Sequence, residues 1–244
     1  RTTLDFFANK AFNKNGWFYH WMDYNTGERR WDSEISSIDT ALLLAGVLTA
    51  KQCFKDDAVI GQLADTIYRR VDFQCMQGDN QYVLSHGWKP ETGFLKNNWD
   101  SYSEDSMLYS WYAWGRPWIE FGGYRYVAHV SPLFIHQYSQ AWVDYRQRRE
   151  YRPPNINYFD NSVAATRAQQ KFFVDVLSKE FRKYGPEMWG MTASDAESGY
   201  NAWGGPPRSD RTDGSVVPSA AGGSVMFAPD ITIGSKDKNG DYAA

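Results

Sequence analysis

The chain has 244 residues, a hydrophobic content of 42% and a formal net charge of −3. This length fits one large domain or two small ones and can bury a sizeable core, and the composition is that of a globular protein. The nearly neutral charge argues against a nucleic acid or an anionic membrane as partner, and no apolar run approaches the ~18 residues that span a bilayer.

The first predicted elements are a hairpin and two helices. Residues 16–24 (GWFYHWMDY), the turn residues 25–27 and residues 29–32 fit a small hairpin. Between Glu34 and Phe54 apolar residues recur at spacings of three and four and also fill the opposite side, so this helix should be buried nearly all round. Apolar residues from Ile60 to Val71 form only a narrow stripe, which predicts a surface helix. This succession is typical of a two-layer helical array.

Two further helices are predicted in the second half of the chain. Helical periodicity extends over residues 130–145 and 163–184, and the second helix should be capped near Asp160-Asn161 and stop at Gly185. Strand signals, such as those of residues 82–84 and 124–130, are short. We therefore expect an all-α fold with short β-hairpins in its loops.

Aromatic residues are unusually frequent, with 11 Trp, 16 Tyr and 14 Phe making up 17% of the chain. Many of them lie in loop-like sequence beside Gly, Asn, Asp and Arg. A flat ring next to hydrogen-bonding groups suits a sugar, which has an apolar C–H face and a rim of hydroxyls. A core rich in tryptophan is the alternative interpretation.

The first acidic candidate site is the stretch WDSYSEDSMLY, residues 99–109. Ser101 and Glu104 match the S-x-x-E capping box, and carboxylates are also favoured in the first turn of a helix. Capping therefore explains the acids at 104 and 105 without catalysis. It does not explain Trp99, Asp100 or Tyr102.

The second acidic candidate site lies in GMTASDAESGYNAWGGPP, residues 190–207. Asp195 and Glu197 stand in a Gly-, Ser- and Asn-rich loop together with Tyr200 and Trp203. No helix cap explains both acids. Two carboxyl groups, one protonated and one ionised, are the minimum for glycoside hydrolysis, and partial burial among aromatic rings raises the pKa of the acid member.

Asp39 in SSIDTALLLAG is a third acidic candidate, although it also fits a first-turn acid after Ser36. Other chemistries find no support in the sequence. Phosphate-binding and dinucleotide-binding glycine motifs are absent, as is G-x-S-x-G, and the four histidines lack zinc spacing. The residues therefore predict no metal site.

Several long segments carry a resemblance to a known family. They are WDSEISSIDTALLLAG, SHGWKPETGF, WDSYSEDSMLY, SPLFIHQYSQAWVDYR, and the run from FDNSVAATRAQQ through WGMTASDAESGYNAWGGPP to DGSVVPSAAGGS. This run of segments resembles the glucoamylase-like domain, a bacterial family that includes endo-β-1,2-glucanases of glycoside hydrolase family 144. The match covers most of residues 16–229.

The resemblance implies an (α/α)6 toroid with its site at one end, formed by residues 1–244 as one domain. Because fewer helices are predicted than a closed barrel needs, we expect the barrel to be incomplete in this chain, truncated on its C-terminal side. The resemblance also implies a β-glucan hydrolase that is periplasmic or secreted, acts with inversion and needs no cofactor. No charged-then-apolar leader opens these residues. We expect a monomer whose partner is an oligosaccharide or polysaccharide.

The family's site is carried over to residues of two kinds. The catalytic candidates are Glu104, Glu197, Asp100, Asp195 and Asp39. The candidate sugar contacts are Trp99, Tyr102, His136, Gln137, Tyr200, Trp203 and Arg208. Which carboxyl group is the acid and which the base stays open at this point.

Other functions remain open as well. A transglycosylase or an α-glucan hydrolase could use the same fold, because a fold alone is a weak guide to substrate. A non-catalytic glycan-binding protein would use the aromatic residues for binding and the acids only as helix caps. A helical scaffold without any glycan role is the third alternative. The linkage of the glucan and endo or exo action are not readable from the residues.

Overall fold

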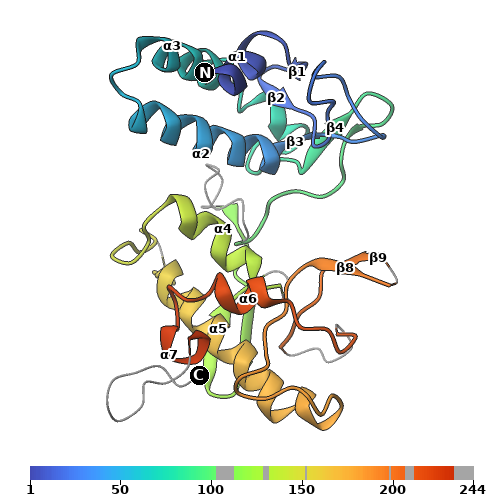
Figure 1. The fold of residues 1–244 in the computed structure, drawn as a ribbon, viewed down its shortest axis with the longest axis vertical. Helices are drawn as coiled ribbons and strands as arrows, with labels where there is room; N and C mark the ends of the chain where they lie inside the picture. Colours follow the sequence, from blue (N-terminus) through green and yellow to red (C-terminus); the bar gives the residue numbers. More distant parts are fainter. Residues whose placement is uncertain (103–112, 129–131, 152, 198, 207–211, 234–244) are drawn as a thin grey trace. The chain divides into compact units, whose positions relative to one another are not determined.

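The computed structural model describes residues 1–102, 113–128, 132–151, 153–197, 199–206 and 212–233. The chain divides into two compact units (Figure 1). Unit 1 comprises Arg1–Asp100 and Met107–Trp114, and unit 2 comprises Ser101–Ser106 and Gly115–Ala244. The expectation of one domain over residues 1–244 stays a prediction.

Unit 1 contains three packed helices, α1 (Thr2–Asn9), α2 (Ser37–Cys53) and α3 (Ala58–Arg69). Asp57 caps α3, since its Oδ1 accepts hydrogen bonds from the amides of Val59 (3.1 Å) and Ile60 (3.2 Å). Residues spaced three and four apart bury one face of each helix in a shared core. This core includes Leu4, Ala8, Leu44, Val47, Ile60, Ala64 and Ile67.

Short antiparallel strands lie beside these helices in Figure 1. β1 (Asn13–Lys14) pairs with β2 (Trp17–Phe18), and β3 (Ile35–Ser36) pairs with β4 (Gly87–Lys89), which in turn pairs with β5 (Gly93–Phe94). A one-turn 3₁₀ helix, η1 (Cys75–Gln77), precedes β4. Because β3 runs directly into α2, the sheet fixes where this helix begins.

In unit 2 the hairpin of β6 (Trp118–Phe121) and β7 (Tyr124–Val127) precedes α4 (Phe134–Trp142) and α5 (Tyr158–Asp175). The side chain of Asn161 joins α5 to β7. Its Nδ2 donates to the carbonyl of Val127 at 2.9 Å, and its Oδ1 accepts from the Val127 amide at 2.6 Å. Asn161 is thus used between two elements and not as a helix cap.

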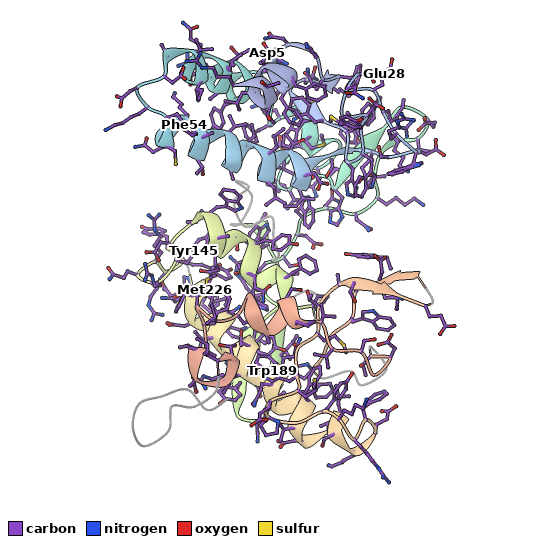
Figure 2. All side chains as sticks on the ribbon, in the orientation of Figure 1. Asp5, Glu28, Phe54, Tyr145, Trp189 and Met226 are labelled. Carbon is purple, nitrogen blue, oxygen red and sulfur yellow. The ribbon has the colours of Figure 1, made fainter. Side chains whose placement is uncertain are left out.

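The rest of unit 2 follows α5 in the chain. It contains η3 (Leu177–Lys179), β8 (Ser194–Ala196), β9 (Gly199–Asn201), α6 (Pro218–Gly222) and α7 (Pro229–Thr232). Trp189, labelled in Figure 2, is buried and donates its Nε1 to the carbonyl of Ile231 at 3.1 Å. This contact holds the α7 segment on the core of unit 2.

The helices predicted over residues 34–54, 60–71, 130–145 and 163–184 are present as α2, α3, α4 and α5. The helix predicted to start within residues 99–109 lies mostly outside the described residues and stays a prediction. The structure differs from the other expectations as follows. The last long helix is capped by Asn157, whose Oδ1 accepts from two amides, and it ends at Asp175 before the tighter turn of η3. α2 is not buried all round, because its partners in unit 1 cover one side and leave Leu48 44% exposed. The strand expected at residues 82–84 is a turn, and strand pairing begins at Gly87.

In the described residues, no helix is long and apolar enough to cross a membrane.

Candidate functional site

The N-terminal end of α2 carries the third acidic candidate, Asp39, in the geometry of a helix cap. The amide of Asp39 donates to Ser36 Oγ at 3.2 Å, and Ser36 Oγ donates to Asp39 Oδ2 at 2.5 Å. The capping interpretation of Asp39 is therefore confirmed. Its side chain nevertheless stays 40% exposed, so the carboxylate can meet a ligand as well as cap the helix.

His20 links Asp39 to a second carboxylate. Its Nδ1 lies 3.0 Å from Glu34 Oε1 and its Nε2 lies 3.7 Å from Asp39 Oδ2. The amide of His20 also donates to the carbonyl of Glu34 at 2.9 Å, which places the two side chains opposite each other. The three groups form a carboxylate–imidazole–carboxylate cluster whose members are all partly exposed, with side-chain exposures between 21% and 40%.

The cluster shifts the pKa values of its members. The hydrogen bond to Glu34 raises the pKa of His20 above 6.5, the Asp39 charge acts in the same direction, and partial burial opposes both. The same hydrogen bond lowers the pKa of Glu34. A protonated His20 therefore favours the ionised form of Glu34. The sequence analysis missed His20 and Glu34, and the only available signal was the aromatic hairpin GWFYHWMDY.

Trp99 joins the same helix end from a distant part of the chain. Its Nε1 donates to Ser37 Oγ at 2.7 Å, and its ring stacks on His86 with centroids 3.9 Å apart. Trp99 is thus bonded to the first turn of α2, which also carries Asp39. Trp99 itself is only 8% exposed, whereas the following residue, Asp100, is exposed.

In unit 2 the hairpin of β8 and β9 presents the second acidic site. Asp195 pairs directly with Tyr200, Glu197 lies in the turn, and all three side chains are exposed. The prediction that these acids share one loop is therefore correct, and their exposure leaves them accessible to a ligand. The expected partial burial among aromatic rings is absent at both acids.

Gln169 of α5 anchors this acidic hairpin on both sides. Its Nε2 donates to the carbonyls of Met191 (3.0 Å) and Gly205 (3.4 Å), and its Oε1 accepts from the Met191 amide at 2.9 Å. The side chain of Gln169 is 1% exposed, so these bonds are shielded from water. A buried amide thus sets the position of the chain that leads into β8 and leaves β9.

Two predicted sugar contacts, Tyr102 and His136, lie in the core of unit 2. Tyr102 is fully buried and stacks on Tyr158 at 4.3 Å, and His136 is 2% exposed with Nδ1 3.3 Å from Ser162 Oγ. Burial lowers the pKa of His136 to about 3. Both rings are enclosed by protein, which leaves no ring face for a sugar in this structure, so they support the fold.

Two further predicted sugar contacts, Gln137 and Trp203, also pack within unit 2. Gln137 donates both amide hydrogens within the protein, to the carbonyl of Ala220 and to Ser224 Oγ, each at 2.8 Å, and so ties α4 to α6. Trp203 packs partly buried against the core of unit 2, and its Nε1 has no hydrogen-bond partner among the described residues. Glu104 and Arg208 lie outside the described residues. Within that described part, no group of three or more His, Cys, Asp or Glu could hold a metal ion.

Comparisons with known proteins give a consistent picture. The profile of the Glycoamylase family, described as "Putative glucoamylase", matches residues 94–239, more than half of the chain. The exo beta-1,2-glucooligosaccharide sophorohydrolase (non-reducing end) of Parabacteroides distasonis is 25% identical over 281 aligned residues, which cover 93% of this chain and 38% of that protein.

Solved structures show the same fold. An endo-beta-1,2-glucanase of Chitinophaga pinensis, solved with sophorotriose and glucose, has a TM-score of 0.79 and 21% identity, covering 93% of this chain and 61% of that chain. A beta-1,2-glucanase of Parabacteroides distasonis has a TM-score of 0.77 and 22% identity, covering 93% and 39%. The chain therefore spans less than two thirds of the length of each of these proteins.

Proposed function

The chain belongs to the Glycoamylase family, and from this premise we propose that the protein is a glycoside hydrolase that acts on a β-linked glucan. The observation that carries the proposal is the family match over residues 94–239, together with the activities named for the similar proteins. These proteins are a β-1,2-glucooligosaccharide sophorohydrolase and β-1,2-glucanases. A β-1,2-linked glucan is therefore the favoured substrate.

The proposed reaction is acid–base hydrolysis by two carboxyl groups with inversion at the sugar carbon. One carboxylic acid protonates the leaving glycosidic oxygen while a carboxylate activates water on the opposite face of the ring. Glu104 and Glu197 are the favoured pair, and Asp100, Asp195 and Asp39 are the alternatives. The exposure of the acids on the β8–β9 hairpin, and of Asp39 beside His20, supports their access to substrate.

The wider arrangement of the protein is part of the same proposal. We infer that the helices belong to an (α/α)6 barrel, since the similar glucanases have this chain's fold over 93% of its length. A periplasmic or secreted monomer fits a polysaccharide substrate, because a long glucan does not cross a membrane. Trp99, Tyr200, Trp203 and Arg208 stay the proposed sugar contacts. Tyr200 is exposed, Trp203 is partly buried, Trp99 is buried in the core of unit 1, and Arg208 lies outside the described residues.

The test is product analysis with the full-length protein on β-1,2-glucan and on starch. We expect release of β-1,2-linked oligosaccharides from the first substrate and no product from starch. Release of glucose from starch alone would instead identify an α-glucan hydrolase, and longer products than substrate would identify a transglycosylase.

Substitutions separate catalysis from binding. Glu104→Gln and Glu197→Gln should each lower kcat by at least ~100-fold, the contribution typical of a general acid or base, with substrate binding largely kept. Glu187→Gln is the matched control, because Glu187 is an exposed acid of unit 2 outside the candidate site. Wild-type rates in both variants would exclude this pair, and binding without any turnover in the unmodified protein would identify a glycan-binding protein.

A further inference from the structure

An exposed aromatic surface lies next to the His20 cluster of unit 1. The ring of Trp21 stacks on His20 with centroids 4.7 Å apart and planes at 16°, and Trp31 meets Trp21 edge-on at 5.7 Å and 72°. Trp21 is 52% exposed and Trp31 is 77% exposed. Large aromatic side chains are highly buried on average, so two neighbouring exposed tryptophans mark a candidate binding surface.

Hydrogen bonds fix the backbone that carries Trp21. Ser33 Oγ donates to the carbonyl of Trp21 at 3.0 Å, and the Arg30 amide donates to the same carbonyl at 3.0 Å. Arg30 in turn pairs with Asp23 at 2.6 Å, and Asp23 accepts from the amides that follow it in the turn. A ligand would therefore meet a surface that needs little ordering on binding.

Trp31 adopts an uncommon backbone conformation, with φ of 43°. For a bulky residue this left-handed region is disfavoured, and such residues concentrate at functional sites. In this conformation the Trp31 ring does not enter the core, since the residue is 77% exposed. The ring contact that the described residues show for Trp31 is its edge-on contact with Trp21, which is itself half exposed.

The surface is continuous with the candidate carboxylate. Trp21 stacks on His20, and the Nε2 of His20 lies 3.7 Å from Asp39 Oδ2. The partly exposed carboxylates of Glu34 and Asp39 therefore place hydrogen-bond acceptors beside His20, the ring on which Trp21 stacks. An apolar face with polar groups at one edge matches a pyranose ring, which has an apolar C–H face and hydroxyl groups around its rim.

We propose that Trp21 and Trp31 form a stacking subsite for a pyranose ring of a β-linked glucooligosaccharide, with the ring's hydroxyls directed toward His20 and Asp39. This inference rests on the proposed glucan hydrolase function, because it assigns a place where that substrate is held. It adds residues that bind substrate and assigns them no chemical step.

The experiment measures binding and turnover of β-1,2-glucooligosaccharides of defined length by the full-length protein and its Trp31→Ala and Trp21→Ala variants. We expect each variant to raise Kd and KM about tenfold, the order that one aromatic stacking contact contributes, while kcat changes less than about twofold. Trp31→Phe keeps a ring and should restore most of the affinity. Trp118→Ala is the matched control. Trp118 lies on β6, is 40% exposed, and has the guanidinium of Arg125 over its ring at 4.2 Å.

The outcomes separate this inference from the proposed function. Glucan hydrolysis with unchanged Kd and KM in both alanine variants would overturn the subsite and leave the hydrolase proposal standing. Absence of hydrolysis and binding in the unmodified protein would overturn the hydrolase proposal and, with it, this subsite. Because exposed rings contribute little to folding, the Tm of the alanine variants should stay within a few degrees of the unmodified protein. A large fall in Tm would show that another part of the protein covers the rings, which would also overturn the subsite.

Discussion

His20 of unit 1 and His136 of unit 2 stand in opposite environments. His20 is partly exposed between two carboxylates, which raise its pKa, whereas His136 is enclosed among Tyr102, Tyr126 and Ser162, where burial lowers its pKa to about 3. The His20 ring can carry a charge and contact a ligand, whereas the His136 ring is a neutral part of the core. The histidine chosen as a sugar contact from the sequence is the buried one.

The same contrast applies to the aromatic residues. Tyr102 has no exposed surface, while Trp31 is 77% exposed, and only the first was selected as a candidate contact. Polar neighbours in the sequence mark a residue as unusual but do not show whether its ring faces solvent. The four predictions that follow test this division between supporting and accessible residues, from the largest expected effect to the smallest.

Removing the buried ring should have the largest effect. Tyr102→Ala deletes a ring that stacks on Tyr158 and leaves a cavity in unit 2, so the free energy of unfolding should fall by ~4 kcal/mol. Trp31→Ala is the matched comparison and should change the free energy of unfolding by less than ~1 kcal/mol. Urea denaturation measures both values. Equal losses in the two variants would contradict the assignment of Tyr102 to the core and Trp31 to the surface.

Acid should destabilise the protein through His136. The folded state keeps His136 neutral down to about pH 3, while the unfolded chain takes up a proton near pH 6.5. The contribution of neutral His136 is thus complete above pH 6.5 and is lost as pH falls, at ~1.4 kcal/mol per pH unit. His136→Asn should remove this slope of unfolding free energy between pH 6.5 and 5. An unchanged slope in the variant would show that His136 is accessible to protons.

Loss of the helix cap should have a smaller effect. Ser36→Ala removes the oxygen that accepts from the Asp39 amide, so the free energy of unfolding should fall by ~1 kcal/mol. Thr49→Ala on the exposed side of the same helix is the control and should cost less than ~0.5 kcal/mol. If Asp39 also binds substrate, Ser36→Ala should change KM more than Thr49→Ala does. No difference between the two variants in either measurement would argue against both roles.

The titration of His20 should give the smallest energetic effect. Because its pKa is raised in the folded state, its stabilising contribution is complete below pH 6.5 and is lost as pH rises through the folded-state pKa. Partial exposure keeps this contribution below ~1 kcal/mol. Proton NMR should give a His20 midpoint above 6.5, which Glu34→Gln lowers. Glu91→Gln is the control and should leave the midpoint unchanged, because Glu91 is an exposed acid of unit 1 that pairs with Arg29 and not with His20. A midpoint below 6.5 in the unmodified protein would contradict the cluster.

Part of the candidate site was readable from the sequence. The spacing of Ser36 and Asp39 predicted a helix cap, and the structure places Asp39 in one. The acids at 195 and 197 were correctly placed in one loop with Tyr200. The cap of α5 was misplaced by a few residues, because Asn161 and Asn157 are equally good caps locally and only the contact with Val127 decides between them.

By itself, the sequence determined the features that depend on near neighbours: the positions of four helices, the Ser36 cap of α2 and the resemblance to a glucan-acting family. Tertiary structure alone decided which side chains are accessible and which distant residues meet. The bond from Trp99 to Ser37 joins residues 62 positions apart, and the approach of His20 to Asp39 needs the pairing of the segments that contain His20 and Glu34. Neither leaves a periodic signal in the sequence, because burial and long-range contacts depend on how the elements pack and not on their spacing.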